Sequence, residues 1–162
     1  MINSTLCYIE KDGQYLMLHR IKKKNDLNHD KWIGVGGRFE KDESPEECLL
    51  REVREETGYI LDRWQFRGVI TFINDRWETE YMYLFTANRY HGDRIECDEG
   101  VLEWVDKDKV FELPLWEGDK LFFPLLARDI PPFLMTLRYI DDKLVYASCN
   151  GEQLPLGKEE QK

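Results

Sequence analysis

The segment 37–59, GRFEKDESPEECLLREVREETGY, constrains the fold of this chain more than any other segment. Ser44 suits the N-cap of a helix, Pro45 suits its first turn, and Glu47 completes a Ser-x-x-Glu capping box. Gly58 suits the left-handed residue that ends a helix. The pattern therefore predicts one short helix with both ends defined.

This helix carries an unusual concentration of carboxylates. Glu52 and Glu56 are four residues apart and share a face, with Glu55 beside them. Like charges at this spacing destabilise an isolated helix by roughly 0.2–0.5 kcal/mol per pair. A hard divalent cation reverses that balance, because Mg²⁺ and Mn²⁺ prefer oxygen ligands. The spacing predicts a Mg²⁺ site, which Mn²⁺ can also fill, with Glu52, Glu55 and Glu56 as metal ligands and catalytic residues.

The motif positions are more specific than the charge. Gly37 is followed at fixed spacing by Glu43 and by the run REVREETG at 51–58. This arrangement resembles the signature of the MutT/Nudix hydrolases, which cleave nucleoside diphosphates linked to another group. Tyr59 is the one departure, at a packing position that is usually aliphatic. A solvated acidic helix is the alternative interpretation of the charge run alone.

Alternating and helical hydrophobic patterns predict an α+β domain. The expected strands cover residues 5–10, 15–19, 32–35, 64–74, 79–88, 100–105, 133–140 and 144–148. The expected helical segments cover residues 44–58, 107–112 and 119–128, with a polar loop at 22–31. The resemblance implies the Nudix fold, an α/β/α sandwich with a central mixed β-sheet.

Length and charge narrow the possible partners. A chain of 162 residues predicts a single domain over residues 1–156, followed by a disordered tail at 157–162. The net charge of −9 argues against a nucleic-acid polymer but allows a small nucleotide held through metal ions. No membrane span is expected. The four cysteines form no CxxC pair, so we expect a cytoplasmic protein, either monomer or homodimer.

The resemblance assigns roles to residues around the helix. Backbone at Gly36 and Gly37 is expected to approach the metal and the phosphates closely, since glycine permits such contact. Glu43 and Arg51 are expected to support the motif by tying the loop to the helix. A direct contact between Arg51 and phosphate is the alternative.

A further carboxylate is expected from outside the motif. Glu99 precedes the strand expected at 100–105 and is our candidate for an additional metal ligand or catalytic base. Glu96 and Asp98 compete for this role, and a solvated acidic loop is the other interpretation. The sequence leaves open which glutamate is the general base.

Candidate substrate-binding residues lie in two other regions. The segment LWEGDKLFFPLL at 115–126 resembles the base pocket of the enzymes that hydrolyse oxidised purine nucleoside triphosphates. Trp116 would stack on the base and Asp119 would accept hydrogen bonds from its edge, with Phe72 lining the same pocket. Arg20 and Lys22, in the basic run 19–24, are candidates for phosphate contact, although such runs are also common in solvated loops.

These features and the resemblance predict a metal-dependent pyrophosphohydrolase of a purine nucleoside triphosphate, for example 8-oxo-dGTP. The expected products are the nucleoside monophosphate and pyrophosphate. The expected cellular role is sanitation of the nucleotide pool. Ile33 and Gly118 depart from the related base pockets, where an asparagine and a second acid stand, and so weaken the assignment of 8-oxo-purine selectivity. Hydrolysis of a nucleotide-sugar or dinucleoside polyphosphate is the alternative reaction. A non-catalytic nucleotide-binding regulator is the alternative from a different functional class.

Overall fold

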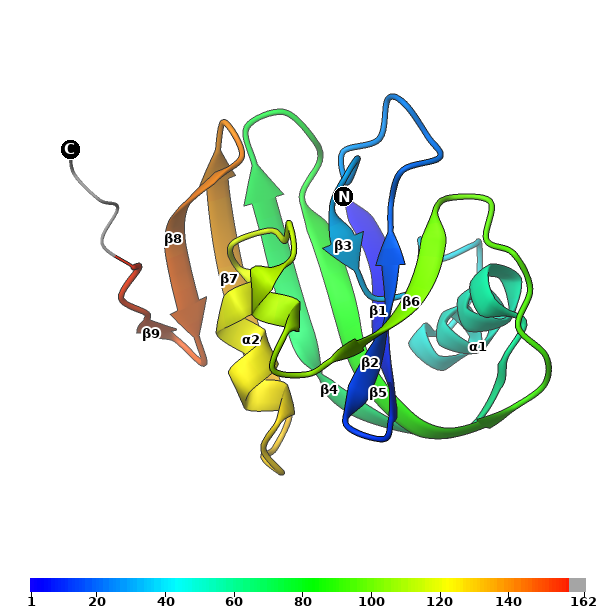
Figure 1. Ribbon diagram of the computed structural model, residues 1–162. Helices are drawn as coiled ribbons and strands as arrows, with labels where there is room; N and C mark the ends of the chain where they lie inside the picture. The colour runs from blue at the N-terminus through cyan, green and yellow to red at the C-terminus, as the bar shows by residue number, and fades with distance from the viewer. Residues whose placement is uncertain (158–162) are drawn as a thin grey trace.

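The computed structural model describes residues 1–157 and consists of a mixed β-sheet with one α-helix on each face (Figure 1). The strands are β1 Ile2–Lys11, β2 Gln14–His19, β3 Trp32–Ile33, β4 Ile60–Asn74, β5 Glu80–His91, β6 Val101–Asp106, β7 Phe133–Ile140, β8 Lys143–Cys149 and β9 Glu152–Gln153. The helical elements are α1 Pro45–Thr57, the 3₁₀ turn η1 Val110–Glu112 and α2 Asp119–Leu126.

The strand order is β3-β2-β1-β5-β4-β7-β8-β9, and β6 pairs with β2 beside this path. The pairs β1–β5 and β4–β7 are parallel, and the other strand pairs are antiparallel. The sheet is therefore mixed, as predicted. Because β4 and β5 pair along most of their length, they form a rigid centre from which the loops of the site extend.

Strand β1 shows how the two faces of the sheet build two cores. Leu6 and Tyr8 point to the α2 side, where they join the cluster that contains Phe122. Cys7 and Ile9 point to the α1 side, where they join a second cluster with Leu49 and Val53 of α1. Successive side chains of a strand alternate between faces, so the apolar run Leu6–Ile9 of β1 serves both cores. The predicted α/β/α sandwich is confirmed.

Two hairpins have the backbone conformation that their turn residues predict. Asp12 and Gly13, between β1 and β2, have φ values of 51° and 76°. Asp141 and Asp142, between β7 and β8, have φ values of 50° and 64°. Positive φ at both central residues matches the right-handed twist of the paired strands, and Asp and Gly tolerate it better than most residues.

The structure differs from the sequence expectations mainly at element ends. Strand β4 begins at Ile60 instead of residue 64, β5 extends to His91 instead of 88, and register shifts allow the pairing to continue past irregular positions. The strand expected at 32–35 ends at Ile33, because Gly34 lies so close to β1 that a Cβ there would be 2.6 Å from the Cys7 carbonyl oxygen. Strand β9 was not predicted.

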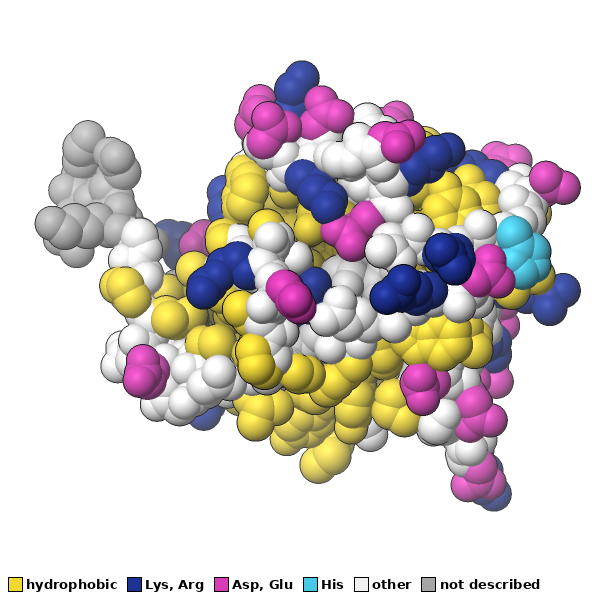
Figure 2. All heavy atoms as spheres, turned by 90° about the horizontal axis from the view of Figure 1, so that it is seen from below, with side chains coloured by type: hydrophobic (Ala, Val, Ile, Leu, Met, Phe, Trp, Pro, Cys, Tyr) yellow, Lys and Arg dark blue, Asp and Glu magenta, His cyan; other side chains and the backbone are white. Residues whose placement is uncertain are grey.

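The surface and the end of the chain relate to the expectations about nucleic acid, membrane and the C-terminal tail. Figure 2 shows one face of the molecule, where acidic and basic side chains are interspersed with apolar ones instead of forming a continuous basic area. Within residues 1–157, no helix is long and apolar enough to cross a membrane. The predicted tail lies, from residue 158 onward, outside the described residues.

Candidate active site

Helix α1 has the caps that its sequence predicts. The Ser44 hydroxyl accepts a hydrogen bond from the Glu47 backbone N–H at 3.1 Å, and the Glu47 carboxylate accepts one from the Ser44 N–H at 2.9 Å. At the other end Gly58 is left-handed, with φ 81°, and its N–H donates to the Arg54 carbonyl. These bonds satisfy backbone groups that a helix end leaves unpaired, and they fix the start and end of the helix.

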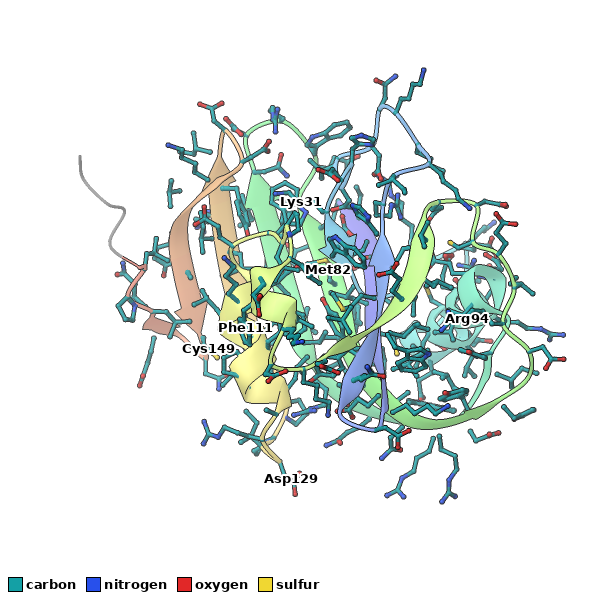
Figure 3. The ribbon with its side chains drawn as sticks, in the orientation of Figure 1. Lys31, Met82, Arg94, Phe111, Asp129 and Cys149 are labelled. Atoms are coloured by element: carbon teal, nitrogen blue, oxygen red, sulfur yellow. The ribbon has the colours of Figure 1, made fainter. Side chains whose placement is uncertain are left out.

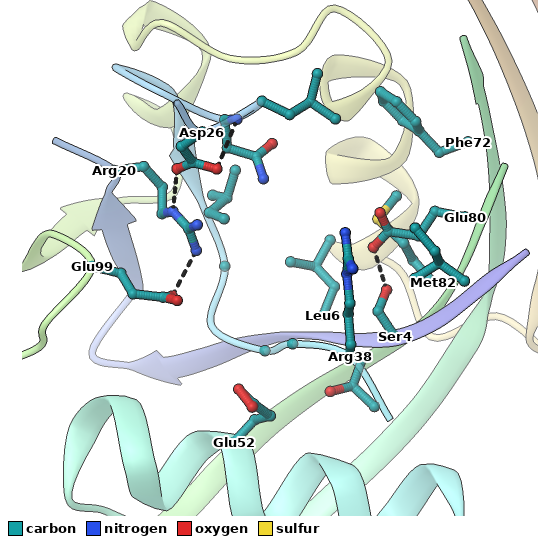
Figure 4. Close-up of a pocket in the computed structure, with 18 of the residues that line it drawn as sticks. Ser4, Leu6, Arg20, Asp26, Arg38, Glu52, Phe72, Glu80, Met82 and Glu99 are labelled. Carbon is teal, nitrogen blue, oxygen red and sulfur yellow. Dashed lines mark hydrogen bonds and ion pairs between the residues drawn. The ribbon is translucent and has the colours of Figure 1, made fainter. Parts of the chain in front are cut away.

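The apolar face of α1 determines where its carboxylates point. Leu49 and Val53 are fully buried in the core on this side of the sheet. Glu52 and Glu56 flank that face and turn toward the backbone of the 34–37 loop, which crosses β1. In Figure 4 Glu52 points from the helix into a cavity that opens beside this loop.

Glu56 is the most unusual group of the site. It is 6% exposed, and one carboxyl oxygen, Oε1, accepts a hydrogen bond from the Gly36 N–H at 2.7 Å. The other oxygen, Oε2, is buried and finds no N–H or O–H donor among the described residues. Burial, with the nearby Glu99 carboxyl adding to it, raises the pKa of Glu56 to about 10. A buried carboxyl in this state is suited to hold a cation or a proton.

The two glycines of the loop allow the backbone to approach unusually closely. A Cβ on Gly36 would lie 1.9 Å from the Thr5 carbonyl oxygen, and a Cβ on Gly37 would lie 2.3 Å from Oε1 of Glu52. Any side chain at position 37 would occupy the space of the Glu52 carboxylate. Glu52 is half-buried, and burial raises its pKa, opposed by the neighbouring Arg51. Glycine is therefore required at both positions for the carboxylates to face the loop.

Arg51 connects the loop to the helix. Its guanidinium makes a two-pronged ion pair with Glu43, with Nε–Oε2 at 2.6 Å and Nη2–Oε1 at 2.9 Å, and donates to the Arg38 carbonyl at 3.0 Å. Further bonds from Nη1 reach Glu52 at 2.9 Å and Glu55 at 3.1 Å. The ion pair with Arg51 lowers the pKa of Glu43 to about 2. All these partners are protein groups, which is the arrangement of a positioning residue.

Glu99 reaches the site from the loop before β6. Its carboxylate accepts hydrogen bonds from Arg20 at 2.6 Å and from Lys23 at 3.0 Å, and Arg20 is also paired with Asp26 at 2.8 Å (Figure 4). Burial opposes ionisation of Glu99, but its proximity to Glu56 and to these cations lowers its pKa on balance. The two shifts run in opposite directions and place the pKa of Glu56 above that of Glu99.

The structure separates the two basic residues named from the sequence. Arg20 lines the cavity, but its guanidinium is paired with Asp26 and Glu99. The Lys22 ammonium instead bonds to the Cys97 carbonyl at 2.7 Å and to Glu96 at 3.3 Å, outside the cavity lining. Lys23, one residue further on, lines the cavity. Lys22 thus does not line the cavity in this structure, because the chain turns it toward the loop at 96–97, and its contact with phosphate stays a prediction.

The carboxylates lie close together without forming a ready-made metal site. Among residues 1–157, no three His, Cys, Asp or Glu side chains converge as metal ligands do. Arginine and lysine neutralise Glu52, Glu55 and Glu99 instead. The unpartnered Oε2 of Glu56 and an all-oxygen donor set nevertheless fit a hard divalent cation.

A cavity of about 870 Å³ extends from these glutamates toward the α2 side of the sheet. Phe72, Trp116 and Asp119 line its far end. Trp116 is 5% exposed, donates from Nε1 to Asn28 at 2.8 Å, and meets the Phe72 ring edge-to-face at 5.2 Å. The structure therefore brings the three predicted base-pocket residues into one cavity with the carboxylates.

Asp119, at the first residue of α2, is buried, with 6% of its surface exposed. Burial raises its pKa from the ordinary 3.8 to about 8, and the nearby Lys31 ammonium opposes this shift. A carboxyl with a raised pKa keeps its proton to a higher pH, and in its protonated form it can both donate and accept hydrogen bonds. Lys31 also lies over the Trp116 ring, with Nζ 5.0 Å from the ring centroid.

Gly118 explains the missing second acid of the pocket. A Cβ at this position would lie 2.4 Å from Cδ1 of Leu137 and 2.8 Å from the Tyr139 hydroxyl oxygen, and the Gly118 N–H donates to that oxygen at 2.7 Å. No side chain fits there without displacing the core. Of the two acids expected at positions 118 and 119, the pocket therefore has only Asp119. Ile33 also lines the cavity.

Comparison with known proteins agrees with the motif and the fold. The family model described as the NUDIX domain matches residues 3–126, most of the chain. The chain belongs to the Nudix family. This membership makes it a hydrolase that acts on a nucleoside triphosphate or a related nucleoside diphosphate derivative, in a family that generally uses a divalent metal ion.

Several relatives cover most of this Nudix chain. It is 34% identical over 120 residues to the uncharacterised Nudix hydrolase YvcI of Bacillus subtilis, covering 71% of this chain and 72% of the relative. It is 35% identical over 126 residues to the oxidised purine nucleoside triphosphate hydrolase of Danio rerio, covering 76% and 78%. It is 38% identical over 134 residues to the CTP pyrophosphohydrolase of Escherichia coli, covering 78% and 89%.

A solved structure supports the same conclusion. The mutator MutT protein from Bacillus halodurans matches with a TM-score of 0.82 at 28% sequence identity, covering 94% of this chain and 99% of that one. The match extends past the NUDIX model, so it includes the part of the chain that follows α2.

Sequence reasoning missed several residues of this Nudix cavity. Asn28 lies in the segment expected to be only a polar loop, yet it accepts the Trp116 hydrogen bond. Ser4, Asn74 and Glu80 line the cavity from β1, β4 and β5. Strand alternation could have indicated Asn74, which is two residues from Phe72 and so shares its face. The pairing of Glu80 with Phe72 requires the register, which the sequence does not give.

Proposed function

We propose that this protein is a Mg²⁺-dependent pyrophosphohydrolase of purine nucleoside triphosphates, with an oxidised purine nucleotide such as 8-oxo-dGTP as the leading candidate. Mn²⁺ can substitute for Mg²⁺. The reaction adds water across a phosphoanhydride bond and releases the nucleoside monophosphate and pyrophosphate. We propose a cytoplasmic role in cleaning the nucleotide pool.

One observation carries the proposal: a single cavity is lined by Glu52, Glu55 and Glu99, next to the buried Glu56, and also by Phe72, Trp116 and Asp119. The glutamate end suits a metal-bound triphosphate. The aromatic end suits a planar base, because aromatic side chains provide flat apolar surface and Asp119 provides a polar group at its edge.

Glu52, Glu56 and Glu99 are the side chains that would hold the metal ion, with Glu55 and the backbone at Gly36 and Gly37 as further ligands. A bound metal ion supplies Lewis acidity at the phosphates and lowers the pKa of a water molecule. The raised pKa of Glu56 means that a proton competes with the metal ion there, because the metal ligand is the carboxylate. The Arg20 guanidinium and the Lys23 ammonium donate hydrogen bonds to Glu99 in this structure. Both groups are placed to turn to phosphate oxygens instead.

The remaining residues hold this geometry in place. Arg51 and Glu43 fix the helix against the loop, so Glu52 and Glu56 keep their positions when charge develops at phosphorus. One of the four glutamates named above acts as the general base that accepts a proton from the attacking water. At the far end Trp116 and Phe72 bind the base, and Asp119 can accept from an N–H or, when it is protonated, donate to a base acceptor.

Two other activities follow from particular observations. The 38% identity to an E. coli CTP pyrophosphohydrolase favours a pyrimidine nucleotide as the second candidate. A relative named GDP-mannose pyrophosphatase, 39% identical over 118 residues, supports a nucleotide-sugar. A non-catalytic regulator has less support, since every glutamate of the motif is present, and Glu52 and Glu55 line the cavity.

The test is a kinetic screen of the purified protein with Mg²⁺ over 8-oxo-dGTP, the four ordinary deoxynucleoside triphosphates, CTP and GDP-mannose. We expect kcat/KM to be highest for a purine triphosphate and higher for 8-oxo-dGTP than for dGTP. A maximum for CTP or GDP-mannose would replace the proposed substrate with that one. Tight nucleotide binding without turnover would favour the regulator.

A further inference from the structure

The α2-side face of the central strands changes from apolar to polar at the cavity. Along β5, Leu84 and Met82 are followed on the same face by Glu80, and Met82 packs against the main core (Figure 3). Along β4, Ile70 and Phe72 are followed on that face by Asn74. The face is therefore core at one end and carries a partly exposed carboxylate and an amide where it borders the cavity.

Glu80 is placed next to the base-binding side chains. It is the register partner of Phe72 across the β4–β5 pair, so the two side chains stand on the same face, roughly 5 Å apart at Cβ. Figure 4 shows both at the end of the cavity away from Glu52 and Glu99. Glu80 therefore faces the base end of the proposed site, not its metal end.

Glu80, Asn74 and Ser4 form one wall of the cavity. The hydrogen bonds of this wall leave one acceptor and one donor unused. Oε2 of Glu80 accepts from the Ser4 hydroxyl at 2.5 Å, and no hydrogen bond to Oε1 is present among residues 1–157. Oδ1 of Asn74 accepts from the backbone N–H groups of Arg76 at 2.9 Å and Trp77 at 2.7 Å. These two bonds orient the amide, and its Nδ2 is buried without a partner.

We propose that Glu80 and Asn74, with Ser4 behind Glu80, are specificity-determining residues that select a base carrying an exocyclic amino group beside a ring or carbonyl acceptor. The inference rests on the proposed function, because the ligand is the base of the nucleotide. Glu80 accepts from the amino group, and the Asn74 amide donates to the neighbouring acceptor. The surrounding apolar residues contact only the faces of the ring: Leu6, Leu27, Ile33 and Met82.

This wall discriminates because both groups are partly desolvated. A base that lacks the amino group leaves the Glu80 carboxylate facing a carbonyl or a C–H, and a missing hydrogen bond to a charged group lowers binding by about tenfold to a hundredfold. Polar sites reject analogues that cannot make their hydrogen bonds more strongly than apolar sites reject size differences.

The experiment compares nucleotide pairs that differ in the amino group, dGTP against dITP and dCTP against dUTP, in the intact protein. We expect the wild type to favour the amino-bearing member of each pair in kcat/KM by about tenfold or more. Glu80→Gln removes the charged acceptor and allows N–H donors to face the base, so it is expected to reduce this preference by raising the KM for dGTP. Asn74→Asp keeps the turn-forming acceptor and loses the donor, and is expected to weaken the binding of dGTP and dCTP.

Glu103→Gln is the matched control, an exposed strand glutamate outside the cavity, and is expected to keep the wild-type preference. Equal preference in wild type and Glu80→Gln, or no preference in the wild type, would overturn the inference. Binding of dGMP and dIMP, measured calorimetrically, separates the two proposals. A Glu80-dependent preference for dGMP without any hydrolysis would support the proposed role of Glu80 in base selection and reject the proposed reaction.

Discussion

At the scale of single residues, the site depends on carboxyl groups whose surroundings disfavour their charged form. Glu56 lies next to the glutamates that line the cavity, Asp119 lines the cavity near Trp116, and burial is the main cause of the raised pKa in both. Their environments differ in what would stabilise the charge. Glu56 neighbours other carboxylates and the loop backbone, whereas Asp119 neighbours the Lys31 ammonium. This contrast is the basis for assigning a metal ion to one end and the base to the other.

Replacement of Glu56 by glutamine keeps the shape of the side chain and removes its ability to become a carboxylate. We expect Glu56→Gln to lower kcat by at least about a hundredfold with the fold intact, because the amide is a weaker metal ligand. Steady-state kinetics across Mg²⁺ concentrations, with circular dichroism as the fold check, measure this.

Glu46→Gln on the same helix is the control for that variant. Its amide oxygen can still accept the hydrogen bond from Nε1 of Trp64, now 2.7 Å from the Glu46 carboxylate, so activity and stability are expected to stay close to wild type. A Glu56→Gln enzyme with normal kcat at low Mg²⁺ would remove Glu56 from the metal site.

Asp119 makes stability depend on pH. Its folded pKa of about 8 lies above its ordinary value of 3.8, so its contribution is fully present below about pH 4 and is lost as pH rises toward 8. Asp119→Asn cannot ionise. We therefore expect the variant to be more stable than wild type at pH 8 and the two to converge toward pH 4, measured as urea midpoints without metal. Parallel pH profiles for the two proteins would show that Asp119 does not titrate in this range.

At the scale of elements, α1 was predictable because its signals are local. The capping box, Pro45 and Gly58 each act within a few residues, and the structure places all of them as expected. The ends of β4 and β5 were not predictable, because their length comes from pairing across register shifts. The cavity wall also depends on that register, so sequence alone could identify the glutamates of the motif but not Glu80.

Helix α2 depends on a buried arginine of β4. Arg67 is 4% exposed, and its guanidinium donates to carbonyls at and just after the last turn of α2 and to the Thr86 hydroxyl. A cation is favourable at a helix C-terminus, where carbonyl groups are unpaired. Since α2 begins with Asp119, Arg67 fixes the helix whose first residue enters the base pocket.

We expect Arg67→Met to lower the free energy of unfolding by about 2–3 kcal/mol, because several buried carbonyls lose a charged donor. Reorientation of α2 should also raise the KM for nucleotide more than it lowers kcat. Urea unfolding and steady-state kinetics measure the two effects, with Arg63→Met, an exposed arginine of the same strand, as control. A stable variant with unchanged KM would show that α2 is held by its apolar face alone.

At the scale of the whole molecule, the sheet separates two cores and positions the cavity at the ends of β1, β4 and β5. The metal end is built by α1 and the loops beside it, and the base end by α2 and the strands. Glu99 and Arg20 lie 79 positions apart in the sequence and meet only through this arrangement. The motif therefore identifies the chemistry, whereas the rest of the fold supplies the substrate pocket.

The most direct test of the central claim is ³¹P NMR of the products formed from 8-oxo-dGTP and dGTP with Mg²⁺, with a parallel sample containing excess EDTA. The account predicts pyrophosphate and the nucleoside monophosphate as the only products, and no turnover after chelation. Release of orthophosphate with the nucleoside diphosphate, or undiminished turnover in EDTA, would contradict a metal-dependent pyrophosphohydrolase.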